Sequence, residues 1–275
     1  INWANKLEKA GCHVIYGLQG LKTHCKIALV VRQEDDGIRR YLHLGTGNYN
    51  DSTAKIYTDL GLFTCNSQYG ADASSLFNVI TGYSRPPEYR HFVVAPHGMR
   101  PFFCRMIRNE TENAKRGLPS GITAKVNSLV DPEIISLLYE ASQAGVPIKL
   151  IVRGICCLKP QIPGVTENIR VISVVGRYLE HSRIYRLGGG DEEKMYIASA
   201  DFMTRNTVRR VEVAAPVYDP AIRERIRYIF DTIMKDDEKG KEQNAEGIYE
   251  DRHINEEPVN SQEIFFQDAY EACNK

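Results

Sequence analysis

The alternation of hydrophobic and polar positions divides the chain into short apolar runs and longer stretches with helical spacing. Apolar runs bounded by Gly, Asp and Pro predict strands, at 12–17, 25–33, 38–45, 121–127, 148–154, 169–175, 181–187, 193–199 and 210–217. Apolar residues that recur every three or four positions predict helices, at 1–10, 51–57, 68–82, 99–115, 132–144 and 220–235. This mixture predicts an α/β fold in which two similar mixed sheets are flanked by helices.

Local signals fix some of these boundaries. Asp35-Asp36-Gly37 stands between two predicted strands and indicates a hairpin. Asp131-Pro132 and Asp219-Pro220 each combine a capping carboxylate with a proline suited to the first helical position. Gly188-Gly189-Gly190 is followed by three acidic residues, which would repel a phosphate, so we expect a hairpin turn there.

Two parts of the chain share one order of elements. A helix end, a glycine and a strand occur at 8–16 and again at 141–152. Each part then reaches a strand that a histidine opens, His24 in the first and His181 in the second. A repeat of this length indicates duplication of a whole subdomain. We therefore expect one subdomain at 1–100 and a second at 101–235.

The charge distribution separates the last forty residues from the rest. Residues 236–275 contain 12 acidic and 4 basic residues, a net charge of −8, so the other 235 residues carry +8. A basic body favours an anionic partner. The acidic segment 236–275 is predicted to be a linker, loose over 236–257, followed by a short helix in which Ile264, Phe265 and Tyr270 could dock.

Composition excludes several classes of protein. The 275 residues are 43% hydrophobic and 25% charged, as in ordinary globular domains. No apolar run is long enough to cross a bilayer, no signal peptide is expected, and no P-loop motif is present. Seven cysteines without a Cys-x-x-Cys pair favour reduced thiols in a cytoplasm over a zinc site. The uncapped start at Ile1 suggests a piece of a longer protein.

The two histidines are the candidate catalytic residues. Each has a cation two positions later, Lys26 and Arg183, which along a strand lies on the same face as the imidazole. Histidine can act as a nucleophile or as an acid or base near neutral pH, and nearby cations offset charge on a transferred group. A single histidine on a strand is most often a half-buried polar residue. Two in corresponding places suggest one composite site.

Three further residues could support such a site. Asn48 and Asp201 are short polar groups in corresponding turns, and could orient the histidines. Arg153 ends a buried strand just before a glycine. A guanidinium in that position is suited to an anionic oxygen.

The histidine motif and the turn that follows resemble a known signature. His24-x-Lys26 followed by Gly45-Thr46-Gly47-Asn48 is similar to the His-x-Lys…Gly-Ser/Thr-x-Asn pattern of the phospholipase D superfamily. Within that superfamily, the sequence from Ile1 to about Met234 most resembles the polyphosphate kinases of the first type. The stretches that carry this resemblance are 21–26, 41–50, 57–59, 117–123, 152–154, 177–181 and 199–206, with a weaker likeness at 261–263.

The resemblance implies a fold, an activity and residue roles. It implies two phospholipase D-like subdomains with the active site between them. Enzymes of this family move the terminal phosphate of ATP onto inorganic polyphosphate, reversibly and with magnesium. The position matching His24 is the one that becomes phosphorylated, and the one matching His181 assists the transfer and contacts ATP. Positions matching Tyr57 and Arg153 also contact ATP.

The resemblance also sets expectations about the whole enzyme. The main Mg²⁺ contacts are expected upstream of Ile1, with no metal ligand in this chain, so the piece alone would be weakly active or inactive. We expect a cytoplasmic homo-oligomer, dimer or tetramer, with peripheral membrane association left open and no nucleic acid as partner. Val31, Arg183 and Ser199-Ala200-Asp201 depart from the phospholipase pattern. Two alternatives remain: a phospholipase D-like phosphodiesterase or nuclease, and a non-catalytic polyanion-binding domain.

Overall fold

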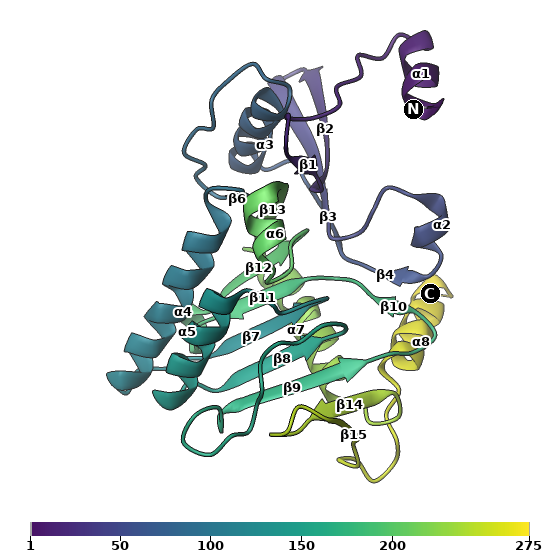
Figure 1. The fold of residues 1–275 in the computed structure, drawn as a ribbon. Helices are drawn as coiled ribbons and strands as arrows, with labels where there is room; N and C mark the ends of the chain where they lie inside the picture. Colours follow the sequence, from purple (N-terminus) through teal and green to yellow (C-terminus); the bar gives the residue numbers. More distant parts are fainter. Residues whose placement is uncertain (1, 275) are drawn as a thin grey trace.

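The computed structural model describes residues 2–274 (Figure 1). The helices are α1 (Asn2–Lys9), α2 (Asp51–Ala54), α3 (Ser67–Ile80), α4 (Met99–Lys115), α5 (Pro132–Gln143), α6 (Thr204–Arg209), α7 (Pro220–Lys235) and α8 (Ser261–Cys273). The strands are β1 (Lys22–Thr23), β2 (Lys26–Glu34), β3 (Gly37–Gly45), β4 (Tyr57–Thr58), β5 (Gly61–Thr64), β6 (Val93–Ala95), β7 (Ile122–Val126), β8 (Ile148–Val152), β9 (Ile169–Val174), β10 (Leu179–Glu180), β11 (Ile184–Leu187), β12 (Lys194–Ala198), β13 (Arg210–Pro216), β14 (Gly240–Gln243) and β15 (Tyr249–Asp251).

The strands form one large sheet and two small ones. The large sheet has ten strands in the order β1-β13-β12-β11-β7-β8-β9-β14-β15, with β6 pairing β13. Strands β7, β8 and β9 are parallel, and β11 runs antiparallel to β7. A three-stranded antiparallel sheet, β2-β3-β5, lies at the other end of the molecule with α3 beside it (Figure 1). The mixed α/β class is confirmed, although the two sheets differ in size.

Strand alternation divides the large sheet into two buried faces. On one face Ala124, Leu150 and Val152 pack with residues of α4 and α5. On the other, Ile151 and Ile172 pack with Phe230 and Ile233 of α7. Covering both faces with helices explains why these strands read as continuous apolar runs.

Many predicted elements and boundaries are confirmed. Helices α4 and α7 have the predicted bounds, and Asp131 and Asp219 accept hydrogen bonds from the first backbone N–H groups of α5 and α7. Strands β2 and β3 form the predicted hairpin, with Glu34 opposite Gly37. The turn at 188–190 joins β11 to β12, as expected.

Three predictions about individual elements are wrong. Residues 12–17 form no strand, because their apolar alternation has no neighbouring strand with which to pair. The helix predicted at 51–57 ends at Ala54, since the next residues are drawn into β4. The strand predicted at 181–187 begins only at Ile184. The sequence did not predict β4, β5, β6, β10 and α6, because these elements are too short to show a hydrophobic periodicity.

The acidic segment is not the predicted loose linker. Strand β14 adds to the large sheet antiparallel to β9, and β15 pairs with β14. Arg252 is buried and donates to the backbone carbonyls of Met234 and Asp236, close to the end of α7. Backbone pairing at an open sheet edge and one buried arginine therefore order a segment whose composition is typical of a flexible chain. The predicted terminal helix is present as α8, and Phe265 packs on the core.

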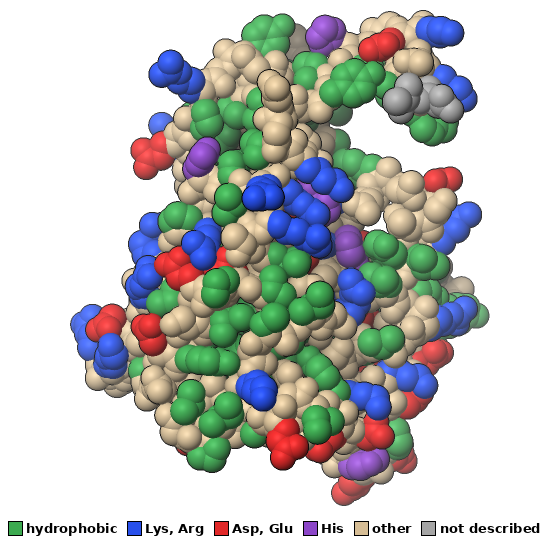
Figure 2. Space-filling view, viewed as in Figure 1, with side chains coloured by type: hydrophobic (Ala, Val, Ile, Leu, Met, Phe, Trp, Pro, Cys, Tyr) green, Lys and Arg blue, Asp and Glu red, His purple; other side chains and the backbone are tan. Residues whose placement is uncertain are grey.

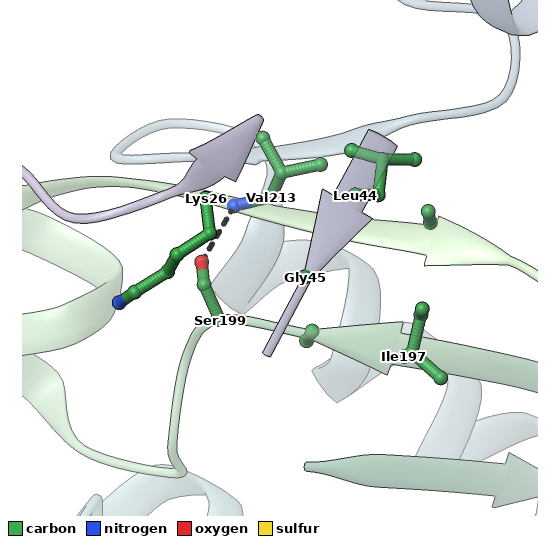
Figure 3. A pocket seen from close by; sticks show the side chains of 8 residues that line it. Lys26, Leu44, Gly45, Ile197, Ser199 and Val213 are labelled. Carbon is green, nitrogen blue, oxygen red and sulfur yellow. Dashed lines mark hydrogen bonds between the residues drawn. The ribbon is translucent and has the colours of Figure 1, made fainter. Parts of the chain in front are cut away.

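The N-terminal part (residues 2–100) joins the C-terminal part (101–274) along a continuous seam. Strands β1 and β6 both pair with β13, so two pieces of the N-terminal part belong to the large sheet. A shared core contains Leu42 and Leu44 from β3 with Val211 and Val213 from β13. A small cavity, of about 10 Å³, lies where Lys26 and Leu44 meet Ser199 and Val213 (Figure 3). Paired strands and a shared core therefore join the two parts.

The packing of α4 on the sheet predicts the cost of one core substitution. Phe103 is 1% exposed, and its ring lies 4.5 Å from that of Tyr185 and 5.4 Å from that of Phe202, between centroids. Phe103→Ala should lower the free energy of unfolding by ~3–5 kcal/mol, because it removes buried surface and leaves a cavity. Denaturant unfolding measures this. Phe63→Ala is the matched control, since Phe63 is 81% exposed; equal losses in both variants would contradict the packing described here.

Candidate active site

His24 lies between β1 and β2, where β13 holds its backbone. The N–H groups of His24 and Cys25 both donate to the carbonyl of Val211 at 3.0 Å. The imidazole Nδ1 lies 2.8 Å from a carboxylate oxygen of Glu212, which is fully buried. The hydroxyl of Ser199 donates to the other oxygen of Glu212. A histidine of the N-terminal part is thus held by a carboxylate of the C-terminal part.

This contact fixes which nitrogen of His24 can react. An ionised carboxylate only accepts hydrogen bonds, so Nδ1 of His24 must carry the proton. In the neutral ring Nε2 then keeps its lone pair. Within residues 2–274, Nε2 has no hydrogen-bond partner, and the His24 side chain is 16% exposed. His24 therefore presents a nucleophilic nitrogen to its surroundings.

His181, a residue of the C-terminal part, is held in the same way by a carboxylate of the N-terminal part. Its Nδ1 lies 2.8 Å from Oδ1 of Asp59, a residue of the N-terminal part. The hydroxyl of Thr46 donates to the same oxygen at 2.6 Å and so orients the carboxylate. Each histidine is therefore oriented by an acid from the other part of the chain.

The surroundings of His181 favour its neutral form. Burial lowers the pKa of His181 below its ordinary value and the positive charge of Arg183 lowers it further, although the hydrogen bond that Nδ1 donates to Asp59 opposes both. Nη1 of Arg183 lies 3.0 Å from Nε2 and 3.3 Å from Nδ1 of His181, so the guanidinium lies against the imidazole ring. A positive charge in this position disfavours protonation of the imidazole.

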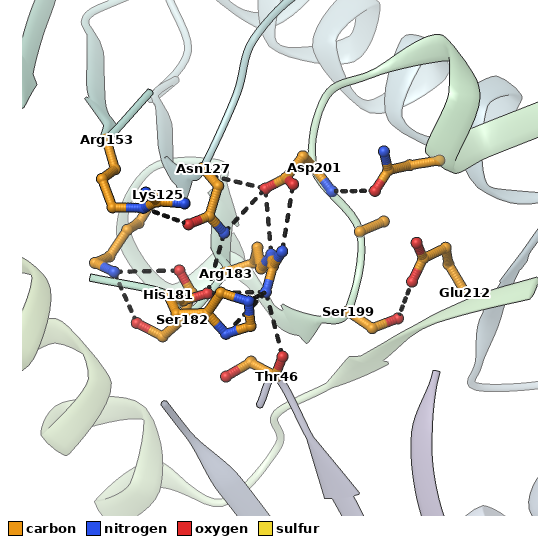
Figure 4. Close-up of polar contacts among 12 residues, drawn as sticks. Thr46, Lys125, Asn127, Arg153, His181, Ser182, Arg183, Ser199, Asp201 and Glu212 are labelled. Atoms are coloured by element: carbon orange, nitrogen blue, oxygen red, sulfur yellow. Dashed lines mark hydrogen bonds and ion pairs between the residues drawn. The ribbon is translucent and has the colours of Figure 1, made fainter. Parts of the chain in front are cut away.

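Arg183 and Asp201 form a buried ion pair at the centre of the site (Figure 4). Nε and Nη2 of Arg183 donate to the two carboxylate oxygens of Asp201, at 3.2 and 3.3 Å. Nη1 donates to the carbonyl of His181 at 2.9 Å and, across the seam, to that of Thr46 at 3.2 Å. Burial raises the pKa of Asp201, but the Arg183 guanidinium and hydrogen bonds from Asn127 hold it below its ordinary value.

Two residues predicted to contact ATP lie next to this network. The ring of Tyr57 lies 4.7 Å from that of His181, between centroids. Nε of Arg153 donates to the side-chain oxygen of Asn127 at 2.8 Å. Asn127 in turn donates to Asp201 and to the carbonyl of His181 (Figure 4). Among the described residues the two terminal nitrogens of Arg153 have no partner, which leaves them open to an anionic group.

Lys26 connects the surroundings of the two histidines. Its ammonium is buried and has no hydrogen-bond partner among residues 2–274. Burial lowers the pKa of Lys26 to about 8, against the opposing charge of Glu212 and with the added repulsion of Arg183. Because Lys26 interacts electrostatically with the acid of His24 and with the cation beside His181, both histidines belong to one charged cluster. An unpaired buried ammonium is costly, and an anion would relieve that cost.

Two predicted supporting residues have other contacts than expected. The Asn48 side chain makes no hydrogen bond within residues 2–274, and Asp201 binds Arg183 and Asn127 rather than an imidazole. The orienting acids, Asp59 and Glu212, were not predicted. Glu212 could have been noticed as the one acidic residue in the largely apolar strand 210–217, whereas nothing local distinguishes Asp59.

The exposed surface is consistent with an anionic ligand. On the face in Figure 2, Lys and Arg side chains gather beside histidines near the middle of the molecule.

A separate cavity of about 710 Å³, lined by residues of α3, β6 and α4, contains neither His24 nor His181. Residues 2–274 hold no group of three or more His, Cys, Asp or Glu placed for a metal ion, and no helix among them is long and apolar enough to span a bilayer.

Known proteins share this sequence and fold. Residues 1–86 match the family described as "Polyphosphate kinase C-terminal domain 1", and residues 92–262 match "Polyphosphate kinase C-terminal domain 2". Proteins named polyphosphate kinase are 50% identical in Lactiplantibacillus plantarum and 53% identical in Synechocystis sp., over 99% and 98% of this chain. The crystal structure of polyphosphate kinase from Porphyromonas gingivalis superposes with a TM-score of 0.91 at 36% identity, over 99% of this chain and 42% of that one.

Two C-terminal domains in sequence and a matching solved structure define the class of the fold. The chain belongs to the polyphosphate kinase family, as the resemblance predicted. It spans 38% and 37% of the length of the two curated relatives.

The geometry at His181 predicts a pH effect. Asp59→Asn should lower the pKa of His181 further, because the carboxylate stabilises the imidazolium. Since this pKa is already below that of the unfolded chain, stability is highest above the unfolded value of about 6.5 and is lost as pH falls towards the folded pKa. Asp59→Asn should extend that loss to lower pH. NMR titration of ¹³C-labelled histidines, assigned with His181→Ala, measures the shift.

Glu212→Gln is the matched control, since it removes the carboxylate at His24 instead. It should leave the titration of His181 in place. An unchanged pKa of His181 in Asp59→Asn would show that the Asp59 contact is absent in solution.

Proposed function

We propose that this chain is the catalytic region of a polyphosphate kinase, which reversibly transfers the terminal phosphate of ATP to inorganic polyphosphate through a phosphohistidine at His24. The family membership supports the reaction, and the charge of the body, +8 outside 236–275, suits a polyanionic substrate. The observation that carries the residue assignment is the crossed pairing of His24 with Glu212 and of His181 with Asp59.

The first half-reaction makes a phosphoramidate. Nε2 of His24 attacks the γ-phosphorus of ATP, a P–N bond forms, and the P–O bond to the β-phosphate breaks, so that ADP leaves with the electron pair. In the second half-reaction a terminal oxygen of polyphosphate attacks the same phosphorus, and the P–N bond breaks back to His24. Glu212 stabilises the positive charge on the imidazole while the P–N bond exists.

The cations around His24 stabilise charge on the transferred group. Lys26 and Arg183 offset the negative charge on the equatorial oxygens, as preorganised donors do in phosphoryl transfer. Arg153 offers two free nitrogens to a phosphate oxygen pair, and Tyr57 lies beside His181 as an aromatic contact for the nucleotide. His181, kept neutral by burial, handles the proton of the incoming or leaving group.

Other parts of the proposal concern the complete enzyme. Magnesium would neutralise charge on the ATP phosphates, and residues 2–274 hold no cluster of three or more His, Cys, Asp or Glu that could bind it. We keep the cytoplasm as the expected location and a dimer or tetramer as the expected assembly.

Labelling tests the nucleophile. With γ-labelled ATP and Mg²⁺, the full-length protein should acquire an acid-labile, base-stable label that His24→Ala abolishes. His181→Ala should slow labelling by about 10²–10⁴-fold, the usual contribution of an acid–base group. Single-turnover labelling followed by acid and base treatment measures both effects.

The matched control is His97→Ala, because His97 is exposed and lies in the wall of the separate cavity. Label that survives in His24→Ala would overturn the assignment. Hydrolysis of a phosphodiester without nucleotide would favour the phospholipase alternative.

The pKa of Lys26 predicts an alkaline limit. The ammonium attracts the ATP phosphates, so kcat/KM should fall as pH rises through about 8, where Lys26 loses its proton in the free enzyme. Lys26→Arg should move this limit upward, since arginine stays protonated. The pH profile of kcat/KM for ATP, between about pH 6 and 10, measures the limit. A limit that stays near 8 in Lys26→Arg would assign it to another group.

A further inference from the structure

Helix α8 reaches back to the strand that carries His181. At its first turn Gln262, which is 6% exposed, contacts β10 through its side-chain amide. Its Oε1 accepts the N–H of Tyr178 at 2.9 Å, and its Nε2 donates to the carbonyl of Tyr178 and to Oε1 of Glu180, each at 2.8 Å. The amide thus uses both its donor and its acceptor on one short stretch, 178–180. Figure 1 shows α8 beside β10 and β4.

Glu180 continues this chain of contacts into the core. Its Oε2 lies 3.1 Å from Nζ of Lys125 and accepts the hydroxyl of Thr58 at 3.1 Å. Both Glu180 and Lys125 are buried. A buried ion pair needs its remaining lone pairs satisfied, and Gln262 satisfies the Oε1 side of this carboxylate.

The contacts of Gln262 end one residue before the reacting pair. Strand β10 is parallel to β4, with Glu180 opposite Thr58. His181 follows Glu180 and donates its backbone N–H to the carbonyl of Thr58 at 3.1 Å, while Asp59 follows Thr58. His181 and Asp59 therefore each directly follow one strand of the β4–β10 pair. A shift of β10 would move His181 against Asp59.

The start of α8 is itself firmly held. The backbone N–H and the hydroxyl of Ser261 both donate to Oδ2 of buried Asp236, each at 2.7 Å. Asn260 caps the helix. On the other side Gly176 leaves room for the amide, since a Cβ there would lie 2.6 Å from Oε1 of Gln262. The position of Gln262 is therefore fixed, and its hydrogen bonds in turn fix the position of β10.

We propose that Gln262 is a positioning residue for His181. Through the amide of Gln262, helix α8 fixes how strand β10 pairs with β4, and so where His181 lies relative to Asp59. This inference rests on the proposed function, in which His181 assists phosphate transfer. Gln262 touches no reacting group. It acts through Tyr178 and Glu180, and loss of its amide would leave Glu180 short of one hydrogen bond and β10 free to shift.

A double-mutant cycle in the full-length protein tests this role. Gln262→Met keeps the volume but removes the amide, and should slow single-turnover transfer from γ-labelled ATP by about tenfold, a fraction of what a 1 Å misplacement can cost. In a His181→Ala background the same change should cost less than about twofold, because the displaced imidazole is already gone. Gly176→Ala, which crowds the amide without altering Gln262, should show the same dependence on His181.

Gln267→Met on the exposed side of α8 is the matched control and should leave transfer unchanged. Equal losses with and without His181, or no loss in Gln262→Met, would overturn the proposal, as would unfolding of both Gln262→Met and Gly176→Ala. A wild-type protein that transfers no phosphate from ATP would instead refute the proposed function itself.

Discussion

The site depends on one buried guanidinium, that of Arg183, at the seam between the two parts of the chain. A buried charge is tolerated only when its hydrogen-bonding groups are satisfied. Arg183 is satisfied by Asp201, by the carbonyl of His181 and, from the N-terminal part, by the carbonyl of Thr46. Separation of the two parts would remove the Thr46 carbonyl from Nη1 of Arg183, whereas the pair of Arg183 with Asp201 lies within the C-terminal part. Electrostatics therefore adds to the apolar seam in fixing where the two parts meet.

The crossed histidine–carboxylate pairs follow from this seam. Strand β13 places Glu212 under His24, and the pairing of β4 with β10 places Asp59 under His181. Neither part of the chain contains a complete pair. An orienting acid selects the tautomer of its histidine, so each part sets the tautomer of the histidine in the other. One charged cluster is therefore shared between the two parts of the chain.

The elements that depend on interactions between residues near each other in the chain could be predicted from the sequence. Helices α4 and α7 and the hairpin between β2 and β3 follow from local periodicity, caps and turn residues. His24 and His181 were singled out as candidates because their motifs repeat. Asp59 and Glu212 were not, since their roles depend on which strands meet across the seam. The order of 236–257 was hidden for the same reason: an open sheet edge and the carbonyls at the end of α7 hold it.

The central claim is that His24 and His181 act on one phosphate from the two sides of the seam. The most direct measurement is a crystal structure of the full-length protein with Mg²⁺ and a non-hydrolysable ATP analogue. We predict the γ-phosphorus at about 3–3.5 Å from Nε2 of His24, an attacking distance, with His181 and Arg153 in contact with the same triphosphate. A triphosphate bound by one part of the chain alone, with its γ-phosphate out of reach of His24, would contradict it.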